Sequence, residues 1–167
     1  MNPLRKRFSF ALGLFSVYLL SIVAIKLAAP DPEMSQNDFP EGCPSESLNC
    51  SFIGPDPHRS GGLKELRFNS SLEIVMGVVN EWVDSQPRTE TVNEGPNQTH
   101  SVFRSFMFRF PDDFVVKGHC DDGDAVIHVY SKSRLGISDI GVNKNRVNSF
   151  AKHMAQYEMP TSDCFMQ

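Results

Sequence analysis

The sequence predicts a two-layer α+β domain, built from a small antiparallel sheet of three to five strands and two main helices, which follows one N-terminal transmembrane helix. Three observations lead to this fold class: an uncharged apolar run near the N-terminus, two segments with the apolar spacing of amphipathic helices, and alternating segments between them. A chain of 167 residues has room for about one domain of this kind.

The N-terminal segment is apolar enough to enter a membrane. Residues 8–25 carry no charge, and their number is close to the ~20 residues that a helix needs to cross a hydrocarbon core. Arg5, Lys6 and Arg7 come just before the run. Because positive charges are retained on the cytoplasmic side, we expect the N-terminus to stay in the cytoplasm and the rest of the chain to cross the membrane.

A cleaved signal sequence is the alternative interpretation of this segment. Cleavage requires small residues in an A-x-A-like pattern, whereas a cut after Ala29 would place Leu27 at the −3 position and Pro30 just after the cut. We therefore expect a cytoplasmic basic tip at 1–7 and a retained single-pass anchor at 8–27. The folded domain would then lie on the periplasmic or extracytoplasmic side of the membrane.

The charge of the chain is divided unevenly. It has 16 basic and 20 acidic residues, and four of the basic ones lie in the first 30 residues, which contain no acid. The remainder carries a net charge of about −8, whereas nucleic-acid-binding domains present a basic surface. We therefore expect no nucleic acid among the partners.

The segment after the anchor is expected to be irregular. Proline and glycine recur throughout residues 28–62, and they interrupt regular elements because proline lacks a backbone donor and glycine is conformationally free. We expect a linker and an irregular strap over 28–62. The folded α+β domain is expected at 63–167, where the apolar patterns begin.

Four cysteines indicate two disulfides. A translocated domain folds where disulfides persist, and an even count then suggests two bridges with three alternative connectivities. We favour Cys43–Cys50, which lie close together in the strap, and Cys120–Cys164, which would join the C-terminal tail to the end of a hairpin. A zinc site is the rival interpretation, but neither pair has the tight spacing that such sites favour. We expect no metal and no cofactor.

The first helix of the domain is expected at about 71–85. Ser70 and Glu73 have the spacing of a capping box, and Pro87 marks the end. Its apolar residues recur three and four positions apart, which indicates one buried helix face: Leu72, Val75, Met76, Val79, Trp82 and Val83.

Four segments with strand character follow this helix. They are 88–93, which is weak, 100–110, in which phenylalanines alternate with other residues, 114–119 and 125–131. The Asp-Gly pair at 122–123 separates the last two, and such a pair between strands is a strong signal for a β-hairpin.

A final helix is expected at about 143–157, with Asn143 as its N-cap. Its apolar side comprises Val147, Phe150, Ala151, Met154 and Tyr157. The resulting order is a helix, several antiparallel strands and a helix. Two helices can cover one face of such a sheet and complete a two-layer domain.

Two stretches carry more polar residues than a core requires. The first is 110–114, and the second is 131–146, which leaves a strand and enters the last helix. A helix start directs backbone N–H groups toward a bound anion, and Arg134 and Arg146 are suited to clamp a carboxylate or phosphate. The candidate ligand-binding residues are Asp112, Asp113, Ser133, Arg134, Ser138, Asp139, Asn143 and Arg146.

These stretches resemble the bacterial and plastid family catalogued as domain of unknown function 1499, over about residues 43–155. The sequence departs from that family after its second matching cysteine, where Phe52 and Ile53 follow Ser51, and Cys120 and Cys164 lie outside the pattern. The resemblance implies a family but no activity. The matching residues are Cys43-Pro44, Asn49-Cys50, Ser105, Arg109-Phe110-Pro111-Asp112-Asp113 and Ser131-x-Ser133-Arg134-x-Gly136-x-Ser138-Asp139-x-Gly141-x-Asn143-x-x-Arg146.

Four interpretations of the polar stretches remain open. In the first they are structural: the acids at 112–113 pair with Arg134 or Arg146, and Ser138 or Asp139 caps the last helix. In the second they bind a small anionic molecule, a lipid headgroup or a peptide carboxylate. In the third the domain assembles with another envelope protein. In the fourth the two acids act as the paired carboxylates of a hydrolase-like enzyme.

The enzyme hypothesis has the least support from the sequence. No histidine lies in either stretch, and no G-x-S-x-G or H-E-x-x-H pattern occurs. We expect an uncharacterised, membrane-anchored envelope domain that acts as a non-catalytic binding or assembly module, with a hydrolase using Asp112 and Asp113 as the alternative. Its expected partners are the membrane, through the N-terminal helix, and an envelope protein or a small anionic ligand.

Overall fold

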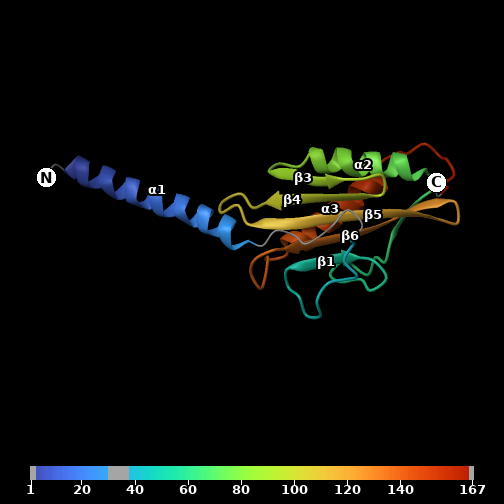
Figure 1. Ribbon diagram of the computed structural model, residues 1–167, viewed down its shortest axis with the longest axis horizontal. Helices are drawn as coiled ribbons and strands as arrows, with labels where there is room; N and C mark the ends of the chain where they lie inside the picture. The colour runs from blue at the N-terminus through green and yellow to red at the C-terminus, as the bar shows by residue number, and fades with distance from the viewer. Residues whose placement is uncertain (1–2, 30–37, 166–167) are drawn as a thin grey trace.

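A computed structural model describes residues 3–29 and 38–165 of the chain. A long helix comes first, and a sheet with two further helices forms an α+β domain (Figure 1). In chain order the elements are α1 (Pro3–Ala28), β1 (Cys50–Ile53), β2 (Leu66–Phe68), α2 (Leu72–Asp84), β3 (Thr89–Glu94), β4 (Gln98–Arg104), β5 (Pro111–Asp121), β6 (Asp124–Ser133) and α3 (Val142–Gln156).

The sheet is antiparallel and has six strands, which is more than the three to five expected. Its order is β1-β6-β5-β4-β3, and β2 pairs with the part of β6 that β1 leaves open. Strand β1 lies in the segment that was expected to be an irregular strap. It has four residues and β2 has three, which is too short for an alternating pattern to be recognised among prolines and glycines.

The strand expected at 100–110 ends earlier than predicted. Strand β4 stops at Arg104, and the chain reverses through a loop before β5 begins. Ser105 closes this loop: its N–H donates to the Phe110 carbonyl at 3.0 Å, and its Oγ accepts from the Phe110 N–H at 3.0 Å. The alternating phenylalanines beyond Arg104 therefore lie in the loop, whereas Phe103 is buried in the core.

The predicted hairpin is confirmed. Strands β5 and β6 pair along their lengths, and the turn between them has Asp122 at φ 51° and Gly123 at φ 85°. Two successive positive φ values are typical of the tight turn that an Asp-Gly pair favours.

Helix α2 begins one residue later than the predicted capping box implied. Ser71 is the N-cap, and its Oγ accepts from the Ile74 N–H at 3.4 Å. Ser70 instead donates from its hydroxyl to the Pro160 carbonyl at 2.9 Å, which ties the start of α2 to the C-terminal tail. The predicted cap was wrong because the adjacent serine is equally suited to an N-cap by residue type, although only Ser70 has the spacing of a capping box.

Helix α3 begins at Val142, so Asn143 lies in the first turn and the prediction that it is the N-cap was wrong. The N-cap is Gly141, with φ 85° and no side-chain hydrogen bond. Glycine suits this place because its positive φ costs no steric strain.

Helices α2 and α3 cover one face of the sheet and form the main core with it. Trp82 of α2 contacts Phe114 of β5 and Phe150 of α3, with ring centroids 5.4 and 5.0 Å apart. The strap lies on the opposite face, where Phe39 packs against Phe52. The main core therefore fixes β5 and α3 relative to each other, and these two elements carry most of the polar residues of interest.

Both expected disulfides, Cys43–Cys50 and Cys120–Cys164, are present. The first ties the strap to the start of β1, and the second ties the C-terminal tail to the end of β5. At the other end of the chain, the 22 residues Arg7–Ala28 of α1 are long and apolar enough to cross a membrane, a property that membrane spans share with signal sequences.

The sheet gives the domain two ends of different character (Figure 1). We call the end that faces α1 the proximal end, and it carries the loops 85–88, 105–110 and 134–141. We call the opposite end the distal end, and it carries the β5–β6 turn and the tail 157–165.

Candidate functional site

The two motif aspartates, Asp112 and Asp113, are neighbours in β5, so their side chains leave the strand on opposite faces of the sheet. The side chain of Asp112 lies on the face covered by α3, and that of Asp113 lies on the face opposite. Both residues are buried. Two carboxyl groups that share a proton must lie about 3 Å apart, so this geometry does not favour a pair of cooperating carboxylates.

Asp112 forms an ion pair with Arg146 of α3. Arg146 Nη2 donates to Asp112 Oδ2 at 2.8 Å, and the two side chains are 10% and 8% exposed. The guanidinium also lies over the Phe103 ring, 4.5 Å from its centroid, and donates to Ser131 Oγ and Asn143 Oδ1. Arg146 therefore directs its donors to groups of its own chain.

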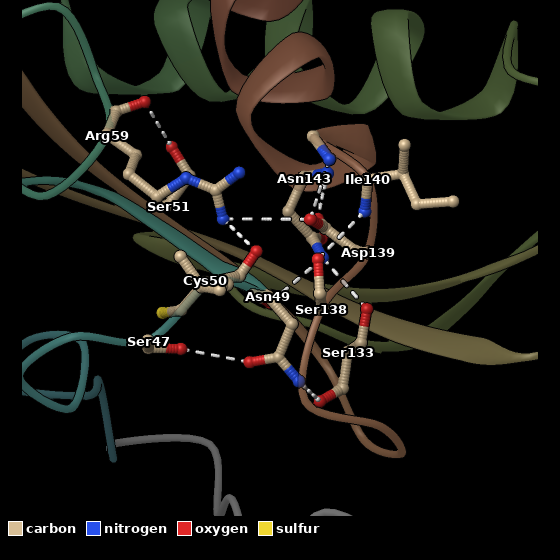
Figure 2. A network of polar contacts seen from close by, with 12 residues as sticks. Ser47, Asn49, Cys50, Ser51, Arg59, Ser133, Ser138, Asp139, Ile140 and Asn143 are labelled. Carbon is tan, nitrogen blue, oxygen red and sulfur yellow. Dashed lines mark hydrogen bonds and ion pairs between the residues drawn. The ribbon is translucent and has the colours of Figure 1, made fainter.

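Asn143 is completely buried and joins three parts of the chain. Its amide nitrogen donates to the Asn49 carbonyl and to Ser133 Oγ, each at 3.0 Å (Figure 2). Its amide oxygen accepts from Ser131 Oγ at 2.6 Å. Because a buried amide is costly unless its groups are paired, Asn143 holds the strap, β6 and α3 in one arrangement.

On the opposite face, Asp113 is bound by two side chains. His100 Nε2 lies 2.7 Å from Asp113 Oδ1, while Arg134 donates to Oδ1 at 2.9 Å and to Oδ2 at 3.0 Å. Burial raises the pKa of the Asp113 carboxyl, but the hydrogen bonds from His100 and Arg134 outweigh burial and hold that pKa below its usual range. Asp113 is thus an ionised anchor for Arg134.

This lowered pKa predicts a pH-dependent stability. Ionised Asp113 stabilises the fold fully above its unfolded pKa of about 3.9, and the contribution is lost as the pH falls through the lower folded pKa. At about pH 7 we expect the wild type to have a higher free energy of unfolding than Asp113→Asn, with the difference shrinking below about pH 4. Urea titrations followed by the fluorescence of Trp82, the single tryptophan, measure this difference.

Asp122→Asn is the matched control, because Asp122 lies in the distal turn at φ 51°, a conformation that asparagine also adopts readily. Its free energy of unfolding should follow that of the wild type at each pH. An advantage of wild type over Asp113→Asn that persists unchanged to about pH 2 would contradict the role given to this carboxylate.

Asp139 satisfies the start of α3. Its carboxylate accepts from the Gly141 N–H at 2.9 Å and from the Asn143 N–H at 2.6 Å (Figure 2). Burial raises the pKa of Asp139, but these hydrogen bonds lower it below its usual range. Ser138 is exposed and accepts from the Ile140 N–H at 3.3 Å. The donors that would otherwise attract an anion to this helix start are therefore bound to Asp139.

The strap holds loop 134–141 from the other side (Figure 2). The amide nitrogen of Asn49 donates to the Gly136 carbonyl at 2.6 Å. Arg59 lies 3.6 Å from the carboxylate of Asp139. Asn49 and Arg59 of the strap therefore hold this loop through Gly136 and Asp139.

A groove between the end of α1 and the proximal end of the domain has a cationic wall. Within residues 3–29 and 38–165, Glu90 is the one acid that lines it, on a chain whose net charge is −4. The basic residues that line it are Lys26, Arg88, Arg104, Arg109 and Arg134.

These arginines differ in how far their charge is already paired. Arg104 donates to Glu90 at 2.7 Å. Arg88 donates to the carbonyl of Arg104 and lies over the Phe106 ring, 5.4 Å from its centroid. Arg109 has no hydrogen-bond or ion-pair partner within residues 3–29 and 38–165. Arg88 and Arg109 are therefore the groove residues best placed to bind an external anion.

The eight residues predicted as a ligand site divide among three places. One network joins Asp112, Ser133, Asn143 and Arg146 on the helix-covered face. Asp113 and Arg134 pair on the other face, and Ser138 and Asp139 shape the loop before α3. Their role in ligand binding stays a prediction, whereas their contacts are those of the structural interpretation.

Sequence reasoning did not select Arg88, Arg104 or Arg109 as site residues. Two of them carried a signal: Arg109 belongs to the matching family pattern, and Arg104 interrupts the apolar face of its strand. Arg88 follows a proline at the end of a helix and gives no sign in the sequence that it reaches the same groove.

Comparison with known proteins gives a family and no activity. A family model described as protein of unknown function (DUF1499) matches residues 32–154. No curated protein matches the chain. Among solved structures, the crystal structure of TTHA0849 from Thermus thermophilus is similar over 54% of this chain and 90% of that chain, with 11% sequence identity and a TM-score of 0.34. A similarity this slight supports no argument about function.

Proposed function

We propose, from the premise that this chain belongs to the DUF1499 family of proteins of unknown function, that it is a membrane-anchored, non-catalytic module that binds an anionic group at its proximal end. The observation that carries the proposal is the set of arginines that the domain itself contributes to the wall of the proximal groove, which persists when α1 enters the membrane: Arg88, Arg104, Arg109 and Arg134. Helix α1 is the anchor, and the domain lies on the extracytoplasmic side, where its disulfides persist.

The ligand site overlaps the motif at Arg109 and otherwise lies beside it. Arg134 and Arg146 are held by buried carboxylates, so the available guanidinium groups are those of Arg88 and Arg109. Both residues have φ 61°, a conformation that is uncommon for residues other than glycine and that clusters at functional sites. Guanidinium groups bind phosphates and carboxylates through paired hydrogen bonds, so the ligand carries one of these groups.

The hydrolase alternative requires Asp112 and Asp113 to reach a substrate. Each carboxylate is instead buried and bound by an arginine on its own face of the sheet. We therefore favour binding over catalysis.

Isothermal titration calorimetry tests the proposal on the full chain in a zwitterionic detergent, with glycerol phosphate, inorganic phosphate and succinate as probes. We expect at least one probe to bind, and Arg88→Gln/Arg109→Gln to weaken its affinity by at least about tenfold, because a hydrogen bond to a charged group contributes about 1.5–3 kcal/mol. Lys152→Gln, on the exposed side of α3, is the matched control and should bind as the wild type does. No binding of any probe, or equal affinity in the double variant, would contradict the proposal.

A further inference from the structure

We propose that the two loops of the proximal end, 105–110 and 134–141, insert their apolar tips into the surface of the bilayer that α1 enters. The inference rests on the proposed membrane anchoring, and it identifies the bilayer surface as the surface that the proximal end contacts. The tips consist of Phe106 and Met107 in the first loop, and Ile137 and Ile140 in the second.

The tips are large apolar side chains left in solvent at one end of the sheet. Phe106 is 80% exposed, Ile137 is 88% exposed and Ile140 is 95% exposed. Single exposed apolar residues are ordinary, but these lie on neighbouring loops at the same end of the sheet (Figure 1). The loops are joined at their bases, where the Arg134 N–H donates to the Pro111 carbonyl at 3.1 Å.

Ile140 is presented at a conformational cost. Its φ is 55°, which is a strained value for a β-branched residue. No burial within the described part of the chain offsets this cost, because the side chain is almost fully exposed. A partner outside the chain that accepts an apolar side chain accounts for this presentation.

Both loops are preformed by the family motif. Ser105 closes the first loop through its two hydrogen bonds with Phe110. Asp139 and Asn49 fix the second loop through their bonds to Gly141 and Gly136. The motif therefore has a use that requires no ligand of its own: it holds two apolar tips in place.

Loop 105–110 contacts α1, and this contact is incompatible with an α1 that spans a membrane. Tyr18 Oη donates to the Met107 carbonyl at 2.8 Å, and the rings of Tyr18 and Phe108 have centroids 6.1 Å apart. In a spanning α1, Tyr18 lies about 15 Å from the Ala28 end, near the bilayer midplane. The polar backbone of a loop does not lie at that depth in a bilayer. When α1 spans the membrane, loop 105–110 therefore loses its contact with Tyr18 and contacts the lipid at the membrane surface instead.

The tether and the charges fit a lipid surface at this end. The chain from Ala29 to Asp38 extends at most about 30 Å, which keeps the domain close to the bilayer. Arg88 lies over the ring of Phe106 and Arg109 belongs to the same loop, and arginine beside an exposed aromatic ring suits the headgroups of anionic lipids. The distal end carries acids that such a surface repels: Asp121, Asp122, Asp124 and Asp163.

A matched pair of tryptophan variants tests the inference. Phe106→Trp places the reporter at the proximal tip, and Phe165→Trp places it at an exposed phenylalanine of the distal end. The full chain is reconstituted in vesicles of phosphatidylcholine and phosphatidylglycerol that contain lipids brominated in the upper part of the acyl chain. The buried Trp82 contributes the same background to both variants.

We expect the added emission of Phe106→Trp to be quenched at least about twofold more than that of Phe165→Trp, because interfacial segments lie about 5–10 Å into the headgroup and acyl boundary. Adding Ile140→Ser to Phe106→Trp should reduce the quenching. Equal quenching of the two variants, in a chain that resists carbonate extraction, would overturn insertion and leave anchoring intact. Release of the chain by carbonate would overturn the anchoring as well, whereas anion binding in detergent is measured independently.

Discussion

Replacement of Arg146 by methionine is expected to lower the free energy of unfolding by about 3–5 kcal/mol, because the Asp112 carboxylate is then buried without its partner. Methionine keeps a flexible apolar side chain beside the Phe103 ring, so the loss reports mainly on the missing charge. Urea titration of the full chain in detergent measures the change. The fluorescence of Trp82 follows unfolding of the domain, because its ring packs in the core against Phe150.

A second variant separates a structural network from a ligand site. Arg146→Met/Asp112→Leu removes both charges and is expected to recover most of the loss, because an apolar pair of similar volume often replaces a buried ion pair without a stability cost. Lys152→Met, on the exposed side of the same helix, should stay within about 0.5 kcal/mol of wild type. A loss below about 1 kcal/mol for Arg146→Met would contradict the structural role and return Arg146 to the candidates for ligand binding.

Helices and the hairpin were predictable because their signals are local. The apolar spacing of α2 and α3 repeats over several turns, so their bounds were predicted within one or two residues. The Asp122-Gly123 turn follows from backbone preference alone. The disulfide pairs followed from proximity in sequence and from the predicted hairpin end, which the structure places beside the tail.

The added strands were not predictable because their signals are not local. Strand β1 forms because the long strand β6 offers an open edge, and nothing in the proline-rich strap reveals that edge. The end of β4 was missed for a related reason. The alternation of phenylalanine with other residues continues through Phe106, Phe108 and Phe110, which suggests a longer strand. The chain nevertheless turns at Ser105, so these phenylalanines lie in a loop.

The candidate site was predictable in residue type but not in arrangement. The sequence contains two acids and two arginines, whose charges are opposite and can pair. Which arginine pairs with which acid, however, depends on the face of β5 that the acid occupies. The groove arginines come from loops far apart in the chain, which only the folded sheet brings to one end.

Loss of the Cys120–Cys164 disulfide is expected to lower the free energy of unfolding by about 4 kcal/mol, because the bond closes a loop with a sequence separation of 44 in the unfolded chain. Loss of Cys43–Cys50, with a separation of 7, is expected to cost about 2 kcal/mol on the same argument. The double alanine variants of each pair, compared by urea titration, measure the two values. Equal losses would contradict a chain-entropy origin and indicate that local packing decides both.

The same cysteines test where the domain folds. In cells whose thiols are blocked before lysis, a domain on the extracytoplasmic side is expected to keep all four cysteines unreactive until a reductant is added, because disulfides persist there. In the cytosol the thiols are kept reduced, and the domain would lose about 4 kcal/mol from the longer bridge alone. A loss of that size is a large part of the stability of a small domain. Cysteines that react with the blocking reagent before any reductant is added would therefore contradict the extracytoplasmic location of the domain.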